Sequence, residues 1–528
     1  MLPSRRSSFF AVAALSLVPA IRLSAQAPTA QPGFSDPQRV AKLSATFGDV
    51  DRAFREHAER EHIPGAVWAI VIDGRVAHIG TTGFRDVASK SPVDSNTVFR
   101  IASMTKSFTA MSILKLRDEG KLSLDDPAEK WVPELAGLKY PTTDSPKLTI
   151  RHLLSHATGF PEDNPWGDQQ LAVTDSEMGR MMRRGIPFSN APGVAYEYSN
   201  YGFAILGRIV TKASGMPYRR YVAENILRPL GMTSTTLEPA SVAPSRLAQG
   251  YRWEDERWKL EPQLPDGAFG SMGGMLTSAR DLGVYVGAFL AAWPPRDGAE
   301  TGPVRRASLR EMQQVQRPAT PGVTRGDDGT LRLYAGGYGF GLGVSSNCDF
   351  AHIVGHSGGL PGFGSVMRWL PEYGIGIVAF GNRTYTGWGQ PTGEALALMS
   401  KTGALEPRMP QAAPVLVARK EAVSRLVMHW SDALADSLAA VNLFLDQSRD
   451  RRRAHVDSVM TKVGPCRTAP AFDFVENALR GQWTLPCERG YARVYITLAP
   501  TMPPSVQLMT VDALTEPEPP RRRGLCPA

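Results

Sequence analysis

The pattern of apolar and polar positions predicts a helix and a β-hairpin near the start of the chain. Apolar residues recur with helical spacing over 46–62, and two strand-like stretches follow over 66–72 and 75–80. The dipeptide Asp73-Gly74 between these stretches favours the two-residue turn that joins antiparallel strands. This part of the chain therefore supplies one helix and two neighbouring strands of a sheet.

Strand-like segments return only after a long region that is mostly helical and loop-like to about residue 330. Helical spacing is found in segments that begin at Ser103, Thr149, Tyr201 and Tyr218. A strand-rich part begins at 337–344, and strands are predicted at 352–356, 365–370 and 376–380. We expect an α/β (α+β) fold, in which early and late strands form one antiparallel sheet flanked by helices, with a large helical insert.

The pattern changes again after Pro410. Residues 419–445 are predicted to form one long amphipathic helix, and a three-stranded meander is predicted at 481–485, 491–498 and 506–511. We therefore divide the chain into a main domain over 45–405 and a small accessory α+β module over 410–528. The module carries no catalytic combination of residues, so the sequence does not indicate its role.

The first 25 residues have the pattern of a secretory signal peptide. Arg5 and Arg6 precede an apolar run over 9–21, which is too short for a membrane span and contains Pro19. Residues 26–44 are polar and contain proline, so we expect a flexible lead-in. These features predict a periplasmic or secreted protein that has no membrane span once the signal is cleaved.

The charge pattern of the chain argues against nucleic acid as a partner. The formal net charge of +8 includes Arg5, Arg6 and Arg22, so +5 remains beyond residue 25. The dense basic clusters at 449–453 and 521–523 are not interleaved with aromatic residues. A solvated surface is expected there rather than a nucleic-acid interface.

Cysteine and histidine spacing predicts a disulfide and no metal site. The cysteines are Cys348, Cys466, Cys487 and Cys526, and disulfides persist in exported proteins. Cys466 with Cys487 is the first choice, although the other pairings stay open. No zinc-type spacing of Cys and His occurs. His152 and His156 are spaced as metal ligands on a helix, but no third ligand accompanies them, and packing or capping is expected.

Ser103 and Lys106 form the first candidate for chemistry. They are three residues apart on a predicted helix, so an amine lies beside a hydroxyl on one face. A buried lysine that loses its charge can remove the proton from a serine. The helix start adds backbone N–H groups for a developing oxyanion. Because this spacing is common, it carries little weight alone, and a capped, solvated helix start is the favoured explanation of the tetrapeptide by itself.

Tyr198 and Asn200 lie together just before a predicted helix. A phenol near two cations can be partly deprotonated and relay a proton, while an asparagine amide can bind a substrate carbonyl. The alternative is a turn in which Asn200 caps the helix. A third element, His356-Ser357-Gly358-Gly359, follows a strand, and its glycines allow close approach of a substrate backbone.

The same segment matches Gly-x-Ser-x-Gly, the nucleophile elbow of α/β-hydrolases, with Ser357 as the nucleophile. That motif needs a helix directly after the serine, and an acid and then a histidine further along. Gly358, Gly359 and Gly362 follow instead, and the later histidines lie in the C-terminal module. We therefore disfavour Ser357 as the nucleophile.

Taken together and in order, Ser103-x-x-Lys106, Tyr198-x-Asn200 and His356-x-Gly358 resemble the three motifs of the serine β-lactamase and penicillin-binding-protein superfamily, in its class C β-lactamase and DD-peptidase-like branch. Stretches at 151–159, 229–233 and 273–282 are similar to that branch as well. The resemblance covers roughly residues 45–400 and implies a β-lactamase/transpeptidase-like fold.

The resemblance also implies a role for each motif residue. Ser103 becomes the acylated nucleophile, Lys106 its proton acceptor or electrostatic partner, and Tyr198 the general base and acid. The backbone N–H groups of Ser103 and Gly359 would hold the oxyanion. The residues expected to bind substrate are Asn200, which would hold the substrate amide, and His356, Ser357 and Gly358.

His356 stands where many members carry lysine. A histidine is charged at neutral pH only if its pKa is raised, so efficient β-lactam hydrolysis is not assured. We expect an exported serine hydrolase that needs no cofactor and acts on a D-amino-acid peptide, an ester or a β-lactam. The substrate would be a small molecule or peptide, such as one derived from peptidoglycan. The alternative is a non-catalytic penicillin-binding protein that senses peptidoglycan.

Overall fold

A large antiparallel sheet forms the centre of the structure, a computed structural model that describes residues 32–325, 329, 331–468 and 471–517. Within these residues the sheet has ten strands, in the order β3-β2-β1-β14-β13-β12-β11-β10-β8, with β9 paired to β10. Its strands are β1 (Gly65–Ile72), β2 (Arg75–Asp86), β3 (Ser91–Pro92), β8 (Arg317–Pro318), β9 (Gly322–Arg325), β10 (Leu331–Tyr338), β11 (Gly343–Asn347), β12 (Ile353–Leu360), β13 (Phe363–Leu370) and β14 (Ile375–Gly381).

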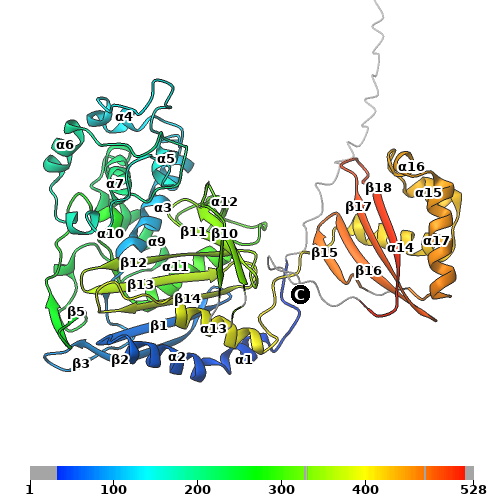
Figure 1. Ribbon diagram of the computed structural model, residues 1–528, viewed down its shortest axis with the longest axis horizontal. Coiled ribbons are helices and arrows are strands. Elements are labelled where there is room, and N and C mark those ends of the chain that lie inside the picture. Colours follow the sequence, from blue (N-terminus) through cyan, green and yellow to red (C-terminus); the bar gives the residue numbers. More distant parts are fainter. Residues whose placement is uncertain (1–31, 326–328, 330, 469–470, 518–528) are drawn as a thin grey trace, which may run out of the picture.

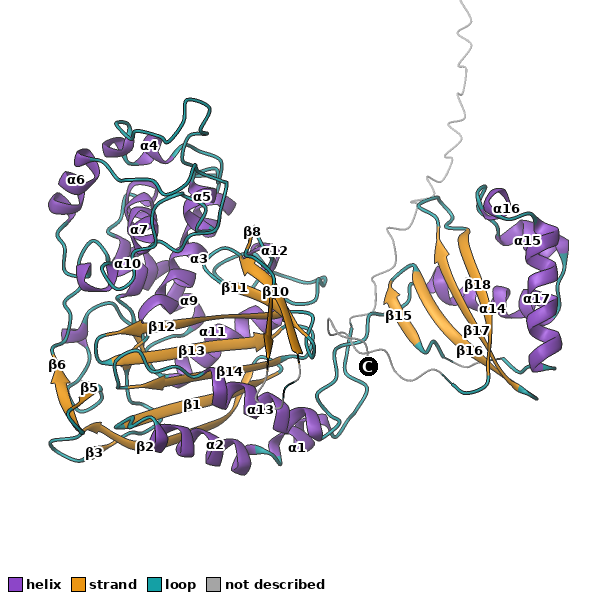
Figure 2. Ribbon diagram, viewed as in Figure 1, coloured by secondary structure: helices purple, strands orange, loops and turns teal. Residues whose placement is uncertain are grey.

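The predicted hairpin and the predicted joining of early and late strands are both confirmed. Asp73 and Gly74 have φ of 51° and 81°, the left-handed conformation that the two-residue turn requires. Strand β1 pairs antiparallel with β2 on one side and with β14 on the other. All eight residues of β1 are buried, because helices cover both faces of the sheet at this point (Figure 2).

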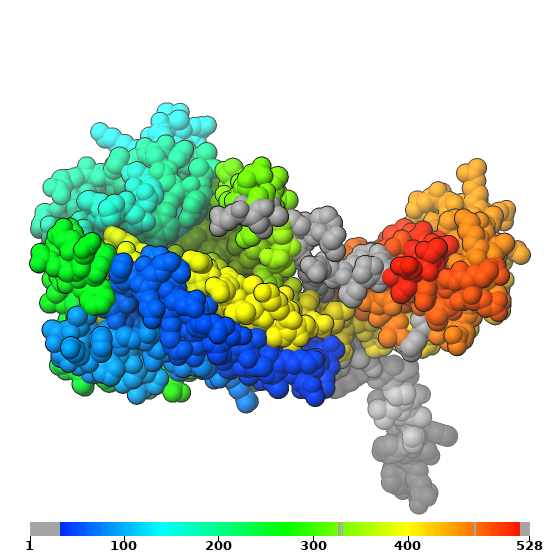
Figure 3. All heavy atoms as spheres, turned by 60° about the horizontal axis from the view of Figure 1, so that its bottom comes forward, coloured from blue at the N-terminus to red at the C-terminus, as the bar shows by residue number. Residues whose placement is uncertain are grey.

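One face of the sheet is covered by α1 (Arg39–Ser44), α2 (Phe47–Arg60) and α13 (Gly389–Lys401). Figure 3 shows the blue N-terminal helices and the yellow α13 lying side by side. The flexible lead-in predicted over 26–44 is therefore wrong where α1 forms. Arg39 in α1 is 3% exposed and forms an ion pair of 2.7 Å with Asp73 in the hairpin turn. The signal-peptide prediction and residues 26–31 lie outside the described residues.

The other face carries α11 (Ala279–Ala292) and the helical insert (Figure 1). The insert centres on α3 (Thr105–Asp118), α7 (Asn200–Ser214) and α10 (Gly270–Gly273), which pack against one another. Its other helices are α4 (Ala128–Trp131), α5 (Ile150–Leu154), α6 (Asp175–Arg184), α8 (Tyr218–Val222), α9 (Arg228–Leu230) and α12 (Arg306–Met312), with short turns η2 (Pro133–Leu135), η3 (Gly167–Gln170), η4 (Ala223–Leu227) and η5 (Pro239–Ser241). Two small two-stranded sheets accompany them: β4 (Phe99–Arg100) with β7 (Leu276–Thr277), and β5 (Gly250–Glu254) with β6 (Arg257–Glu261).

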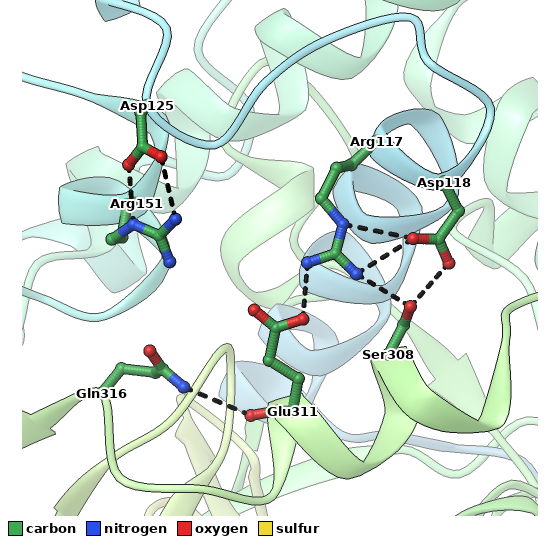
Figure 4. Close-up of polar contacts among 7 residues, drawn as sticks. All are labelled: Arg117, Asp118, Asp125, Arg151, Ser308, Glu311 and Gln316. Atoms are coloured by element: carbon green, nitrogen blue, oxygen red, sulfur yellow. Dashed lines mark hydrogen bonds and ion pairs between the residues drawn. The ribbon is translucent and has the colours of Figure 1, made fainter.

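The far end of α3 is tied to α12 by a polar network (Figure 4). Arg117 donates to Glu311 at 2.5 Å and to Ser308 at 2.8 Å. Ser308 in turn donates to Asp118 at 2.6 Å. These partly buried contacts hold the C-terminal end of the helix that carries Lys106 at its start.

Residues beyond 413 form a separate lobe with its own core (Figure 1). The lobe has a four-stranded sheet in the order β15-β16-β17-β18. Its elements are α14 (Pro414–Met428), α15 (Asp432–Leu438), α16 (Leu443–Asp446), α17 (Arg449–Val463), β15 (Phe474–Asn477), β16 (Arg480–Cys487), β17 (Gly490–Leu498) and β18 (Val506–Leu514). Cys466 and Cys487 are joined by a disulfide within this lobe.

The single helix predicted over 419–445 is wrong, because the chain forms three shorter helices there. Ser431 caps a new helix by accepting a hydrogen bond from the backbone N–H of Leu434. Ala439 and Gln447 are extended at the ends of α15 and α16. In the described residues, none of the helices is long and apolar enough to cross a membrane.

Candidate active site

Ser103 lies in a short 3₁₀ turn, Ala102–Met104, directly before α3. The residue before it, Ala102, has φ of 49°, in the left-handed region that non-glycine residues rarely adopt. Such strain is characteristic of functional sites, where the surroundings hold the backbone in place. Ser103 is 8% exposed and lines a cavity of about 780 Å³. Its backbone N–H is at the start of a helix, where N–H groups have no helical acceptor.

Lys106 is completely buried beside Ser103. Its Nζ donates to Ser103 Oγ at 3.0 Å, to Asn200 Oδ1 at 2.6 Å and to the carbonyl oxygen of Met272 at 2.8 Å. Burial lowers the pKa of Lys106 to about 7, and the nearby Asp168 and Asp163 oppose this shift. The lysine therefore has a substantial neutral fraction at neutral pH.

The three partners of Lys106 are not equivalent. Asn200 Oδ1 and the Met272 carbonyl can only accept hydrogen bonds, whereas the Ser103 hydroxyl can also donate one. When Lys106 is neutral, its two protons stay on the two acceptor oxygens. Its lone pair is then directed at the hydroxyl of Ser103, which is the geometry of a general base.

The position of Asn200 is set by the start of α7. The carboxylate of Asp163 accepts from the backbone N–H of Asn200 at 2.6 Å and of Tyr201 at 2.8 Å. A carboxylate at a helix N-terminus is favoured by the helix dipole. Ser199, not Asn200, is the capping residue, because its side chain accepts from the N–H of Gly202. The capping role considered for Asn200 is therefore wrong.

Both ends of the Asn200 amide are occupied within the protein. Oδ1 accepts from Lys106, and Nδ2 donates to Asn164 Oδ1 at 2.6 Å. Asn200 is fully buried. The amide oxygen of Asn200 therefore orients Lys106, and the contact with a substrate amide stays a prediction.

Tyr198 is half-buried beside Lys106, whose Nζ lies 4.8 Å from the centre of its ring. Burial raises the pKa of Tyr198 well above its ordinary value, and a hydrogen bond with Ser103 opposes this only in part. The phenol is therefore protonated at neutral pH. The expectation that cations would partly deprotonate Tyr198 is not met, because burial and the nearby Tyr196, Asp168 and Asp163 raise its pKa.

His356 to Gly359 lie inside strand β12 and line the same cavity, apart from Gly358. Burial, with a smaller effect of Lys106, lowers the pKa of His356 to about 4, so this ring is neutral. Its Nδ1 is 2.5 Å from the carbonyl oxygen of Ser357 and its Nε2 is 2.8 Å from the Tyr338 hydroxyl. Because the carbonyl can only accept, the proton sits on Nδ1, and Tyr338 donates to Nε2.

Strand β12 leaves one edge open beside the nucleophile. Its pairing with β11 covers Ile353 to Gly355, whereas its pairing with β13 continues to Leu360. A Cβ atom at Gly358 would lie 2.2 Å from the carbonyl oxygen of Ile101, so only glycine fits where β12 passes the Ser103 turn. Ser357 lies within a strand and is followed by another strand, which excludes a nucleophile elbow.

Several residues of the site carry no recognisable sequence signal. Asp163 and Asn164 position Asn200, as described above. Asp168 is 2% exposed, accepts a hydrogen bond of 3.0 Å from Tyr385, and burial raises its pKa to about 6. These residues come from loops and short turns whose spacing matches no motif.

The two histidines considered as metal ligands have structural roles. His152 Nδ1 accepts from the N–H of Thr149 in a capping box, and His156 Nδ1 accepts from the N–H of Ser199. Among the described residues, no group of three or more His, Cys, Asp or Glu side chains is placed to hold a metal ion.

The sequence model of the Beta-lactamase family matches residues 50–398 of this chain, more than half of its length. The chain belongs to the β-lactamase family. This β-lactamase-family protein is 28% identical over 338 residues to Protein flp of Staphylococcus aureus (strain COL), covering 63% of this chain and 62% of that protein. It is 27% identical over 338 residues to Penicillin-binding protein 4* of Bacillus subtilis (strain 168), covering 60% of this chain and 67% of that protein.

A solved structure shares the fold. The structure of the octameric penicillin-binding protein homologue from Pyrococcus abyssi is similar with a TM-score of 0.56 and 22% identity, over 86% of this chain and 96% of that one. The β-lactamase/transpeptidase-like fold predicted from the three motifs is therefore confirmed. The chain spans 62% of the length of Protein flp.

Proposed function

We propose that this β-lactamase-family protein is a serine hydrolase that forms an acyl-enzyme at Ser103. The observation that supports this most strongly is the buried Lys106, held 3.0 Å from Ser103 Oγ with a pKa lowered to about 7. A lysine kept only for packing gains nothing from burial, because removing a charge from water is costly. A lysine poised near neutral pH suits a general base.

In acylation, neutral Lys106 removes the hydroxyl proton of Ser103 while Oγ attacks the substrate carbonyl carbon. The electron pair moves to the carbonyl oxygen, which is held by the backbone N–H groups of Ser103 and Gly359. Tyr198 then donates its phenolic proton to the leaving nitrogen or oxygen as the bond to carbon breaks. The proton on Lys106 returns to Tyr198, so one proton passes from Ser103 to the leaving group.

Deacylation repeats these steps with water. Lys106 accepts a proton from the water that attacks the ester of Ser103, and the same two N–H groups hold the second oxyanion. Collapse breaks the bond to Ser103 Oγ, which takes the proton back. In this scheme Tyr198 remains a protonated donor, in agreement with its raised pKa.

The proposed substrates are amides or esters, including a D-amino-acid peptide, a simple ester or a β-lactam. Neutral His356 does not supply the fixed cation that a lysine would supply at the same place. We therefore rank esters and peptides ahead of β-lactams. We also propose export, supported by the pattern of residues 1–25 and by the Cys466–Cys487 disulfide, which suits an oxidising compartment.

A fluorophosphonate probe, followed by mass mapping, tests the nucleophile. We expect one covalent label on Ser103 in the wild type and in Ser357→Ala, and none in Ser103→Ala. Hydrolysis of an ester, a D-amino-acid amide and nitrocefin by the wild type then tests turnover. A label on Ser357 overturns the proposal, and acylation of Ser103 without any hydrolysis favours the sensing alternative.

A further inference from the structure

A second cavity lies next to the catalytic cavity and has no part in the proposed mechanism. This side pocket has a volume of about 420 Å³, and its lining includes Phe160, Glu162, Asp163, Trp166, Arg184 and Tyr201. Preformed cavities of this size, with apolar walls and a few polar groups, commonly hold small molecules. In the described part of the chain, the linings of the two cavities share no residue. The side pocket is therefore a separate place for a ligand.

One segment of the chain, residues 161–168, forms a wall between the two cavities. Asn164, Pro165 and Asp168 line the catalytic cavity, whereas Pro161, Glu162, Asp163 and Trp166 line the side pocket. The carboxylate of Asp163 accepts the backbone N–H of Asn200 at 2.6 Å, and the Asn200 side chain holds Lys106. A ligand that contacts Asp163 is thus two residues away from the proposed base.

Aromatic rings form part of the side pocket. The ring centres of Phe160 and Trp166 lie 6.4 and 6.2 Å from that of Tyr201. Trp166 is 45% exposed, although burial of such a large apolar side chain is favourable. An aromatic ligand would cover this indole, and the faces of the rings also attract a cation.

The charges around the side pocket favour a cation. Its lining contains the carboxylates of Glu162 and Asp163. Asp163 accepts two backbone N–H groups at the start of α7, and a carboxylate has about four acceptor positions, so it can accept a further donor. The C-terminal end of α6, which carries partial negative charge, also borders the pocket. Among the described lining residues the single cation is Arg184, which is exposed in the last turn of α6, where the helix dipole favours it.

We propose that the side pocket binds a small aromatic amine and that the bound amine activates the Ser103 site. The ammonium group donates to Asp163, and the aromatic body covers Trp166. Binding stands independently of the proposed function, whereas activation rests on it.

Activation follows from the charge of the bound amine. Asp168 and Asp163 favour the charged form of Lys106. An ammonium group beside Asp163 offsets part of this effect, so more Lys106 is neutral and able to accept the proton of Ser103. The other titratable groups around the lysine are uncharged at neutral pH: the phenol of Tyr198 and the rings of His156 and His356.

Calorimetric titration tests binding without any reaction. The probes are 2-phenylethylamine and 2-phenylethanol, which have the same shape but differ in charge. We expect the amine to bind about tenfold more tightly than the alcohol, which corresponds to one hydrogen bond to a charged group. Asp163→Asn should remove this preference, because asparagine keeps an acceptor oxygen for α7 but has no charge.

Variants at exposed tryptophans show where the amine binds. Trp166→Ala should weaken binding of the amine by about tenfold, and Trp166→Phe should retain part of the affinity. Trp258→Ala on β6 is the matched control, because Trp258 is 39% exposed and lies outside the linings of both cavities. Its affinity for the amine should equal that of the wild type.

Hydrolysis of phenyl acetate at pH 6 tests activation. We expect saturating 2-phenylethylamine to raise kcat/KM by about three- to tenfold, the effect of a charge that acts through Asp163. Saturating 2-phenylethanol should have no such effect, and Trp166→Ala should lose the activation. Because kcat/KM contains only the steps up to release of phenol, transfer of the acetyl group to the amine does not alter it.

Three results overturn the proposal: the amine binds no more tightly than the alcohol, its affinity survives Trp166→Ala, or the bound amine leaves kcat/KM unchanged. Absence of any ester hydrolysis is a different failure. In that case the proposed function fails and the activation fails with it, while the titrations still decide whether the side pocket binds the amine.

Discussion

The side-chain oxygen of Asn200 lies 2.6 Å from Nζ of Lys106 and accepts a hydrogen bond from it. This contact fixes one of the three proton positions of the lysine, and the carbonyl of Met272 fixes a second. The remaining position faces Ser103. Lys106 can therefore gain or lose a proton without moving. Its proposed role as proton acceptor in both acylation and deacylation requires this.

Replacing Asn200 by aspartate is expected to shift the pH dependence of the reaction to higher pH. A carboxylate in contact with Nζ favours the charged lysine and raises its pKa, by about 1–3 units for such a contact. Less neutral Lys106 is then present at neutral pH, so kcat/KM should fall by about tenfold or more. The measurement is the kcat/KM profile for an ester between pH 5 and 10.

Asn225→Asp is the matched control, because Asn225 donates to the carbonyl of Tyr221 at the surface of the insert. Its profile should coincide with that of the wild type. An unshifted profile for Asn200→Asp contradicts the role of Asn200 in tuning Lys106.

The wild-type profile itself is expected to rise with pH through about 7, the lowered pKa of Lys106. The sign follows from the base, which is inactive when protonated and active above its pKa. His356 is neutral above its pKa of about 4, so His356→Gln should keep the same inflection even if the rate changes. If the inflection disappears in His356→Gln, the histidine is the titrating base.

A methyl group at Gly358 is expected to separate β12 from the Ser103 turn. The added Cβ would lie 2.2 Å from the Ile101 carbonyl oxygen and 2.5 Å from Ser365 Oγ. Overpacking of this kind costs about 1–3 kcal/mol of stability. Gly358→Ala should therefore lower the melting temperature and reduce labelling of Ser103. Gly393→Ala in α13 is the control, because no atom lies within 4 Å and alanine favours the helix.

Loss of the Cys466–Cys487 disulfide is expected to destabilise the C-terminal lobe alone. The bond joins residues 21 apart in sequence, and closing a loop of this size contributes about 3 kcal/mol. The double variant Cys466→Ser/Cys487→Ser should exchange amide hydrogens faster in β16 and β17. Fluorophosphonate labelling of Ser103 should persist, because the core of the lobe shares no residue with that of the main domain. Equal destabilisation of both parts contradicts this separation.

Local chemistry explains what the sequence could predict of the fold. The hairpin at Asp73-Gly74 follows from two residues that accept positive φ. Helix α1 was missed because its anchor is Arg39, a charged residue whose burial depends on Asp73 in a distant turn. The break of the C-terminal helix at Ser431 had a visible signal, the serine cap, but the apolar spacing around it outweighed that signal.

Some residues of the candidate site could likewise be predicted from the sequence, and others could not. Ser103 and Lys106 share a helix start, so their spacing carried the prediction. The neighbours Asp163, Asn164 and Asp168 act through contacts across more than 30 positions in sequence with no repeated spacing. The sequence also could not predict that Tyr198 is protonated. Burial raises its pKa, and this burial depends on the packing of the whole insert.

The half-paired strand β12 has a consequence for handling the protein. A row of backbone N–H and C=O groups beside glycines is also a surface on which foreign strands can pair, as exposed sheet edges do in aggregating proteins. An extended peptide from a neighbouring, partly unfolded molecule would compete for the same groups as a substrate. We therefore expect the open edge of β12 to favour self-association of the protein, and occupancy of the cavity should protect against it.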